Sequence, residues 1–260
     1  MTTGTAPHGP VPPPGVVSRT APEVADHAGR AVDLPELDAA VSNCFACPRL
    51  VAWREEVATT KRASFRHQHY WGRPVPGNGP GDAEIAVLGL APAAHGGNRT
   101  GRIFTGDRSG DVLFAALHRA GLANQPTSVA ADDGLTLAHT RIFAAVRCAP
   151  PDNKPLPVER DTCAPWLHAE LGLIRPTLRV VVALGAFAWA AWWPAMTAVY
   201  GRSAPVPRPA FGHGAHVRVP GAPDLLGCYH VSQQNTFTGR LTPAMLDGVL
   251  HRAKELAGLA

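Results

Sequence analysis

Five short apolar segments that alternate with longer helical patterns most constrain how this chain can fold. The strand candidates are each four to six residues long, are mostly rich in Val, Ile, Leu and Ala, and lie at residues 85–90, 141–146, 179–184, 216–219 and 225–230. Helical spacing of apolar residues lies between and after them, at residues 110–120, 158–174, 186–200 and 242–259. This alternation is typical of an α/β fold, in which helices cover both faces of a mostly parallel sheet.

Length and composition predict one folded domain preceded by a tail. The 260 residues, of which 45 % are hydrophobic and 17 % charged, are enough to bury one substantial core. The first 30 residues instead hold six prolines among Gly, Ser and Thr, a composition that cannot form a core. We therefore expect a disordered, Pro-rich tail over residues 1–30 and a single domain over residues 31–260.

The charge balance and the absence of long apolar runs bound the environment of the protein. Lys and Arg number 24 against 20 Asp and Glu, and the pI is about 9.0, which is compatible with a polyanionic partner. No stretch approaches the ~18 consecutive apolar residues of a membrane span, and no export signal is recognisable. We expect a cytoplasmic protein without a membrane partner, in which the five cysteines bind metal or are buried rather than form disulfides.

A glycine-rich loop follows the first strand candidate. Residues 89–107 combine many glycines and alanines with one proline and several polar side chains. Ligands of open parallel sheets bind beyond the carboxyl ends of the strands. A second polar loop begins at His230, at the end of the last strand candidate, so we expect the two loops to meet in one cleft.

Four of the five cysteines fall into two groups. Cys44 and Cys47 form a C-x2-C pair between two helical patterns, whereas fourteen residues separate Cys148 from Cys163. Four thiols suit either a tetrahedral zinc ion or a cubane iron–sulfur cluster, and the spread, proline-containing second pair favours the cluster. Simple burial of the thiols is the remaining alternative. Cys228 lies in a strand pattern and is interpreted as a core thiol.

Several motifs together resemble one known family. They are GLAPAAHGGNRTGR at 89–102, FTGD at 104–107, the aromatic and glycine-rich loop at 70–77, RCAPP at 147–151, HVSQQN at 230–235 and the four-cysteine spacing. With these motifs in the same order, the chain from about residue 34 to residue 259 is similar to the family 5, or type b, uracil-DNA glycosylases.

The resemblance implies both a structure and an activity. The structure is a three-layer α/β/α sandwich that carries a [4Fe-4S] cluster on Cys44, Cys47, Cys148 and Cys163. The activity is DNA repair: a damaged base is flipped out of double-stranded DNA, its N-glycosidic bond is hydrolysed, and an abasic site remains. We expect a monomer associated with a prokaryotic-type nucleoid.

His230 and Asn98 are the predicted catalytic residues. Cleavage of the glycosidic bond puts negative charge on the departing base, and His230 can donate a hydrogen bond to the base oxygen, or else it only pins its own loop. Many relatives in the wider superfamily carry a carboxylate where this chain has Ala91. We predict that Asn98 positions the water instead; its alternative is to hold a turn. Asp107 is the weaker candidate because it also suits a helix cap.

The resemblance also implies a base-binding pocket around the glycine-rich loop. Phe104 would stack on the extruded base, although a core aromatic is the ordinary interpretation of such a residue. Backbone amides would read the base edge at Gly89, Leu90, Ala91 and Ala93. Related families have an asparagine at the position of Ala144, and its loss predicts a roomier pocket that also accepts hypoxanthine and xanthine.

Residues around three loops are predicted to hold the DNA. Phosphate contacts from basic and amide side chains fix a protein on a duplex. The candidates are Arg99, Arg102 and Arg108 at the first loop, Arg147 and Lys154 at the second, and Asn235 and Arg240 at the third. Phe237 in the third loop is either a wedge that fills the gap left by the flipped base or a residue packed beneath the loop.

Two other classes of protein stay open at this point. A non-catalytic metal-cluster module that binds nucleic acid would need the basic loops but neither His230 nor Phe104. A nucleotide-processing α/β enzyme would use the first loop for phosphate, but residues 96–101 match neither the Walker A pattern nor a dinucleotide fingerprint. We expect the cysteine-bound group to be structural, because hydrolysis of a glycosidic bond needs no electron transfer.

Overall fold

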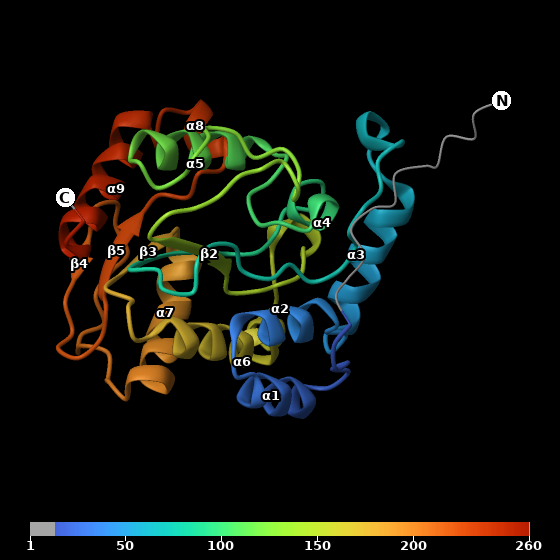
Figure 1. Cartoon of the computed structure of the whole chain (residues 1–260), viewed down its shortest axis with the longest axis horizontal. Coiled ribbons are helices and arrows are strands. Elements are labelled where there is room, and N and C mark those ends of the chain that lie inside the picture. Colours follow the sequence, from blue (N-terminus) through green and yellow to red (C-terminus); the bar gives the residue numbers. More distant parts are fainter. Residues whose placement is uncertain (1–13, 260) are drawn as a thin grey trace.

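The computed structural model describes residues 14–259 and has a five-stranded sheet at its centre (Figure 1). The strands are β1 (Ile85–Gly89), β2 (Thr140–Ala144), β3 (Val180–Leu184), β4 (His216–Val217) and β5 (Asp224–Cys228). Their order is β2-β1-β3-β5-β4; β4 is antiparallel to β5 and the other pairs are parallel. The predicted mostly parallel sheet is confirmed.

Helices cover both faces of this sheet (Figure 1). α5 (Arg108–Arg119) and α9 (Pro243–Ala257) share one hydrophobic cluster with Ile85 and Val87 of β1. α6 (Pro157–Ile174) and α7 (Ala186–Tyr200) share the opposite cluster with Ala86 and Leu88. Successive strand residues face opposite sides, so a strand buried on both faces is a continuous apolar run in the sequence. The α/β/α sandwich is therefore confirmed.

The predicted tail is wrong for its last ten residues, which form α1 (Ala21–Arg30). Thr20 and Glu23 make a capping box, and Pro22 occupies the first turn, where a missing N–H costs nothing. Val24 and Ala28 are buried in a cluster that α6 also contributes to. Proline content alone therefore misjudged this segment; residues 1–13 of the predicted tail lie outside the described residues.

Two helices flank the Cys44 and Cys47 pair, as predicted: α2 (Leu34–Ser42) and α3 (Pro48–Thr60). Short elements too brief for a periodic pattern were not predicted. They are η1 (Ala63–Phe65), α4 (Gly97–Thr100) within the glycine-rich loop, η2 (Pro151–Asn153) and α8 (Gln233–Phe237). No helix between residues 14 and 259 has the length and hydrophobicity to cross a membrane.

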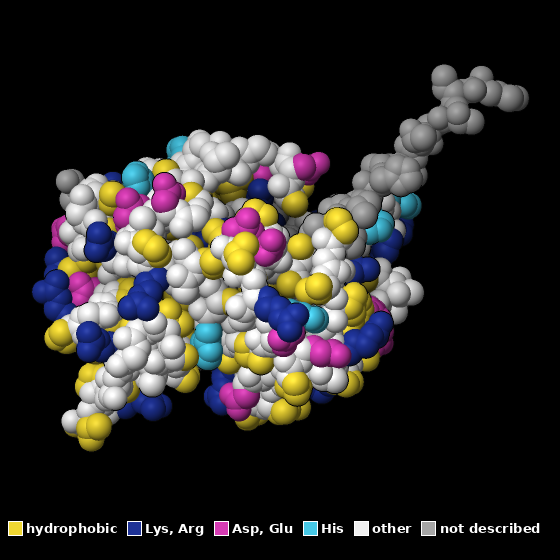
Figure 2. All heavy atoms as spheres, turned by 60° about the horizontal axis from the view of Figure 1, so that its bottom comes forward, with side chains coloured by type: hydrophobic (Ala, Val, Ile, Leu, Met, Phe, Trp, Pro, Cys, Tyr) yellow, Lys and Arg dark blue, Asp and Glu magenta, His cyan; other side chains and the backbone are white. Residues whose placement is uncertain are grey.

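The chain carries a formal net charge of +4. On the face that is turned forward in Figure 2, Lys and Arg side chains are accompanied by Asp and Glu. Electrostatic attraction of a polyanion requires a local excess of positive charge rather than a global one. Any DNA-binding surface must therefore be located from the residues around a specific cleft.

Candidate active site

A pocket of about 490 Å³ lies where β1 and β5 end. Leu90, Ala91 and Ala93 line it from the glycine-rich loop, and His230 lines it from the loop after β5. The cleft predicted between the two loops is therefore confirmed. Its position at the carboxyl ends of parallel strands is the usual ligand site of such sheets.

Phe104 forms part of the pocket wall and also belongs to the core. Its ring lies so close to Gly89 that a Cβ atom added there would be 3.1 Å from the ring. The backbone of Phe104 is left-handed, with φ of 52°. Such a conformation costs a non-glycine residue of order 1–3 kcal/mol and is concentrated at functional sites. The interpretation as a core aromatic is confirmed, since the ring is largely buried. The ring also lines the pocket, and stacking on a base stays a prediction.

His230 faces Phe104 across a ring-centroid distance of 6.1 Å. Burial lowers the pKa of His230 below its ordinary value of 6.5, so the imidazole is neutral at neutral pH. The imidazole makes no hydrogen bond with any residue between 14 and 259, which leaves its N–H group available to a ligand. Gly185, with φ of 89°, lets the His230 side chain lie close to the backbone. A Cβ atom at position 185 would be only 3.3 Å from the Cβ of His230.

Asp107, ranked below Asn98 from the sequence, lines the pocket with His230 and Phe104. Its Oδ1 accepts a hydrogen bond of 2.9 Å from the Gly110 amide, so it also caps α5. Burial raises the pKa of this carboxyl above its ordinary value of 3.8. The cap and the pocket position are therefore compatible.

Asn98 is not brought to the pocket, contrary to its predicted role. The side chain is 0 % exposed, and its Nδ2 donates to the backbone oxygen of Arg54 at 3.1 Å. Asn98 lies in α4, and this hydrogen bond turns its amide towards α3. The alternative prediction, an asparagine that holds a turn of its own loop, does not describe this contact either: the hydrogen bond joins α4 to a helix 44 residues away in the sequence.

Asp152 and Asn153 line the pocket from η2 and were missed from the sequence. Both have left-handed backbones, with φ of 54° and 56°. A signal was available, because Asp and Asn adopt this conformation more readily than other non-glycine residues. The stretch was interpreted only as the surroundings of Cys148.

Gly89 and Ala144, two predicted base-binding residues, lie beneath the pocket rather than in its lining. They are paired neighbours at the ends of β1 and β2. Ala144 is buried in the cluster that contains Phe104, and the Phe104 ring covers Gly89. Ala144 therefore does not line the pocket, and its predicted effect on pocket width stays a prediction.

Arg99 and Arg102 are not available for the predicted phosphate contacts, because internal partners occupy their guanidinium groups. Arg99 donates to the backbone oxygens of His95 and Gly106 and to Gln68 Oε1. Arg102 makes a buried ion pair of 2.8 Å with Asp133. Both side chains therefore fasten the glycine-rich loop.

The third loop holds Asn235, Phe237 and Arg240. Asn235 Nδ2 donates to the backbone oxygen of His230 at 2.8 Å and so holds the catalytic candidate in place. The Arg240 guanidinium is exposed over the ring of Tyr229 at 4.7 Å. Phe237 is 72 % exposed, which excludes the packed alternative and leaves the ring free to contact a partner.

A groove of about 660 Å³ continues from the pocket. It shares Ala93, Asp107, Arg108, Asn153 and Gln233 with the pocket. Exposed side chains of Arg62 and Arg108 line it, and the η1 segment forms its far wall. The basic segment 61–69 was not singled out from the sequence, although it contains three Lys or Arg residues within nine.

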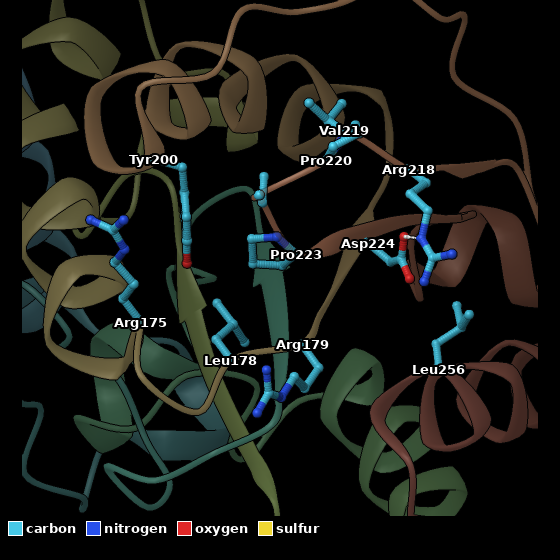
Figure 3. Close-up of a pocket in the computed structure, with 12 residues that line it drawn as sticks. Arg175, Leu178, Arg179, Tyr200, Arg218, Val219, Pro220, Pro223, Asp224 and Leu256 are labelled. Atoms are coloured by element: carbon cyan, nitrogen blue, oxygen red, sulfur yellow. Dashed lines mark ion pairs between the residues drawn. The ribbon is translucent and has the colours of Figure 1, made fainter.

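A second pocket, of about 570 Å³, lies at the amino ends of the strands, opposite the candidate active site (Figure 3). Arg175, Arg179 and Arg218 surround it, and Arg218 makes an ion pair of 3.3 Å with Asp224. It lies where β3 and β5 begin, and none of the predicted site residues lines it. This pocket is therefore separate from the candidate active site.

All four predicted cysteine ligands line one cavity. Burial raises the pKa of Cys47 to about 12 and that of Cys148 to about 11, and it raises the pKa values of Cys44 and Cys163 as well. Among residues 14–259, no three side chains of His, Cys, Asp or Glu are arranged to hold a single metal ion. Cys228 is separate and fully buried, as predicted.

The surroundings of these cysteines fit an anionic group. The buried guanidinium of Arg54 donates to Cys148 Sγ at 3.1 Å, and the Arg147 amide donates to Cys163 Sγ at 3.3 Å. Such donors stabilise sulfur that carries negative charge, as in a thiolate-bound cluster. Arg147 itself is bound to Glu170, which removes it from the predicted DNA contacts.

The three-layer sandwich, with a pocket at the carboxyl ends of its strands, places the chain among the α/β proteins that bind a ligand at the strand ends. The model of the uracil DNA glycosylase superfamily matches residues 76–254 of this chain. A Type-5 uracil-DNA glycosylase from Mycobacterium bovis is 58 % identical over 232 residues, which cover 89 % of this chain and 85 % of the relative. One from Thermus thermophilus is 55 % identical over 217 residues, covering 83 % and 94 %. The chain therefore belongs to the uracil DNA glycosylase superfamily and, within it, to the type-5 family.

Proposed function

We propose that this chain hydrolyses the N-glycosidic bond of uracil in double-stranded DNA and leaves an abasic site. The observation that carries the proposal is the meeting of His230, Phe104 and Asp107 in one pocket at the strand ends. Family membership supports the reaction class, and the three side chains supply a hydrogen-bond donor, a stacking ring and a carboxylate.

His230 stabilises the departing base. As the bond breaks, negative charge gathers on the base oxygen and positive charge on the deoxyribose. A neutral imidazole N–H aimed at that oxygen lowers the barrier, and its effect is strengthened in a site of low dielectric constant. The lowered pKa of His230 keeps the ring neutral, so the donor retains its proton while the base leaves as an anion.

Asp107 and Asn153 position the attacking water on the sugar. A carboxylate accepts a hydrogen bond from water and favours the cationic sugar electrostatically, and an amide can both donate and accept. Both residues line the pocket beside His230, whereas Asn98 does not. We therefore assign to Asp107 and Asn153 the role that the sequence suggested for Asn98.

The damaged base enters the pocket by flipping out of the duplex, because neither the bond nor the base edge can be reached in the stack. Phe104 stacks on the extruded base, and the exposed Phe237 fills the gap that the base leaves. The DNA strand continues along the groove of Arg62 and Arg108, where basic side chains meet its phosphates.

Hypoxanthine and xanthine are further substrates in this proposal. Ala91 and Ala93 are small lining residues. Ala144 stands where related families have an asparagine that binds the base edge, and a pocket without that contact discriminates less sharply between bases. Release of uracil but not hypoxanthine from matched duplexes would refute this broader specificity while leaving uracil excision intact.

A [4Fe-4S] cluster on Cys44, Cys47, Cys148 and Cys163 is the proposed cofactor. When bound, it supplies a covalent cross-link between segments that are distant in the chain. The cysteines would fasten α3 to the body of the domain, and α3 in turn holds α4 of the glycine-rich loop through Asn98. No proton or electron of the hydrolysis is routed through this site.

The decisive experiment incubates the purified protein with duplexes that contain uracil, hypoxanthine or xanthine and then cleaves abasic sites with alkali. Base release that His230→Ala abolishes or strongly reduces supports the proposal. Tight binding of the same duplexes without base release would instead identify a non-catalytic DNA-binding module. Iron and sulfide content, measured on the same protein, tests the cofactor separately.

A further inference from the structure

Arg54 is a charged side chain in the interior of the protein. It lies on α3, is 0 % exposed, and is among the largest fully buried side chains. Arginine is almost never fully buried unless it is paired, because removing its charge from water is costly. Its surroundings must therefore contain the compensating charge.

The protein groups around Arg54 compensate this charge only in part. The guanidinium lies over the Phe45 ring at 4.8 Å from its centroid, a cation–π contact without a formal negative charge. Nη1 donates to the Cys44 backbone oxygen at 3.0 Å and to Cys148 Sγ at 3.1 Å. The Glu55 carboxylate is 3.8 Å from Nη2, but its side chain is 53 % exposed and shared with solvent. Nε and Nη2 are buried without a hydrogen-bond partner in the described part of the chain.

The cavity beside Arg54 is the one that the four cysteines line. With neutral thiols, only the exposed Glu55 carboxylate and the Phe45 ring would offset the charge of the guanidinium. A group held by four thiolates would add negative charge at Cys148 Sγ, which Arg54 already contacts by a hydrogen bond. Hydrogen bonds to cluster sulfur, together with burial and charge, set the reduction potential of iron–sulfur clusters. The position of Arg54 therefore affects more than packing.

We propose that Arg54 is a positioning residue for the cysteine-bound cluster, which it neutralises electrostatically and holds through the hydrogen bond to Cys148 Sγ. The inference rests on the proposed cofactor. A cation beside the cluster favours the more negative, reduced state, so Arg54 raises the reduction potential. It also slows loss of the cluster, because release would remove the largest negative charge beside the buried guanidinium.

The test compares the cluster-loaded wild type with Arg54→Met, Arg54→Lys and the control Arg119→Met. Arg119 lies on α5, does not line the cysteine cavity, and makes a partly exposed ion pair of 2.6 Å with Asp247. We measure the midpoint potential by redox titration and the rate at which visible absorbance is lost in air. Arg54→Met should have a more negative potential and lose the cluster at least about tenfold faster, since charge-assisted hydrogen bonds are worth about 1.5–3 kcal/mol. Arg119→Met should match the wild type.

Unchanged potential and unchanged loss rate in Arg54→Met would overturn the proposal. If Arg54→Met does not fold, Arg54→Lys answers the question: it keeps the charge but not the planar fork, and we expect a smaller shift in the same direction. A wild type without iron would overturn both this inference and the proposed cofactor. Uracil release by that same iron-free protein would show that the proposed glycosylase activity stands on its own.

Discussion

The ring of Phe104 and the imidazole of His230 lie 6.1 Å apart between centroids and are tilted by 42°. This separation is within the range of contacting ring pairs, so the two side chains support each other. One comes from the loop after β1 and the other from the loop after β5. The proposed stacking wall and the proposed hydrogen-bond donor are therefore a single packed unit, and substitutions of either should affect the same chemical step.

Substitution of Phe104 by Ala should lower kcat/KM for uracil release by about 10- to 100-fold. Stacking of a base on an aromatic ring is worth about 1–3 kcal/mol, and this contact is lost. Phe114→Leu, in the same hydrophobic cluster but outside the pocket lining, is the control for core damage. If both variants lost the same activity and the same thermal stability, the role of Phe104 would be to pack the core and not to stack on the base.

His230→Ala should lower kcat by about 100- to 1000-fold, the loss seen when a donor to a developing oxyanion is removed. The control is His213→Ala: His213 packs against Tyr229 and does not line the pocket. Single-turnover rates on a uracil duplex measure the chemical step directly. A wild-type rate in His230→Ala would contradict the proposed donor.

The pH dependence of the reaction should follow the lowered pKa of His230. Burial disfavours the charged imidazolium, so protonation requires a pH below the ordinary value of 6.5. Single-turnover activity should therefore be retained at neutral pH, and the midpoint of its fall should lie below pH 6.5. A loss of activity with its midpoint above pH 6.5 would show that protonation of His230 does not cause the fall in activity.

Features that depend on the periodicity of apolar residues could be predicted from the sequence, whereas side-chain positions that depend on individual contacts could not. Five strands and the long helices follow from apolar patterns that extend over several turns or a whole strand. The location of His230 follows from its position at a strand end, but its predicted catalytic role came from the family resemblance and stays a prediction. Asn98 and Asp107 are both polar residues of one loop, and only the three-dimensional path separates them. In the short helix α4, the side chain of Asn98 contacts the backbone of Arg54. The backbone then turns through the left-handed conformation of Phe104, and Asp107 lines the pocket. Likewise, the charges of Arg99 and Arg102 are visible in the sequence, but their internal partners are not.

Asp107→Asn and Asn98→Ala should separate these two roles. Asparagine is also a good helix cap, so Asp107→Asn should keep near wild-type stability while losing the carboxylate and lowering kcat by at least about tenfold. Asn98→Ala leaves the Arg54 carbonyl without its donor and should destabilise the protein by about 1–3 kcal/mol, with a smaller effect on kcat at a temperature where it stays folded. Chemical denaturation and single-turnover rates give both quantities. The reverse pattern would return the water-positioning role to Asn98.

Arg62→Ala should weaken DNA binding through the groove and leave base release from bound DNA nearly unchanged. The Arg62 side chain is exposed in a groove that shares five lining residues with the pocket, and no described residue makes an ion pair with it. Loss of one phosphate contact should weaken binding for all sequences and reduce the slope of log affinity against log salt by about 1. Arg175→Ala removes an equal charge in the pocket at the amino ends of the strands (Figure 3), where no DNA contact is expected. Because both variants lower the net charge equally, a salt slope reduced in Arg62→Ala alone would place the strand in this groove, and equal slopes in the two variants would contradict that path.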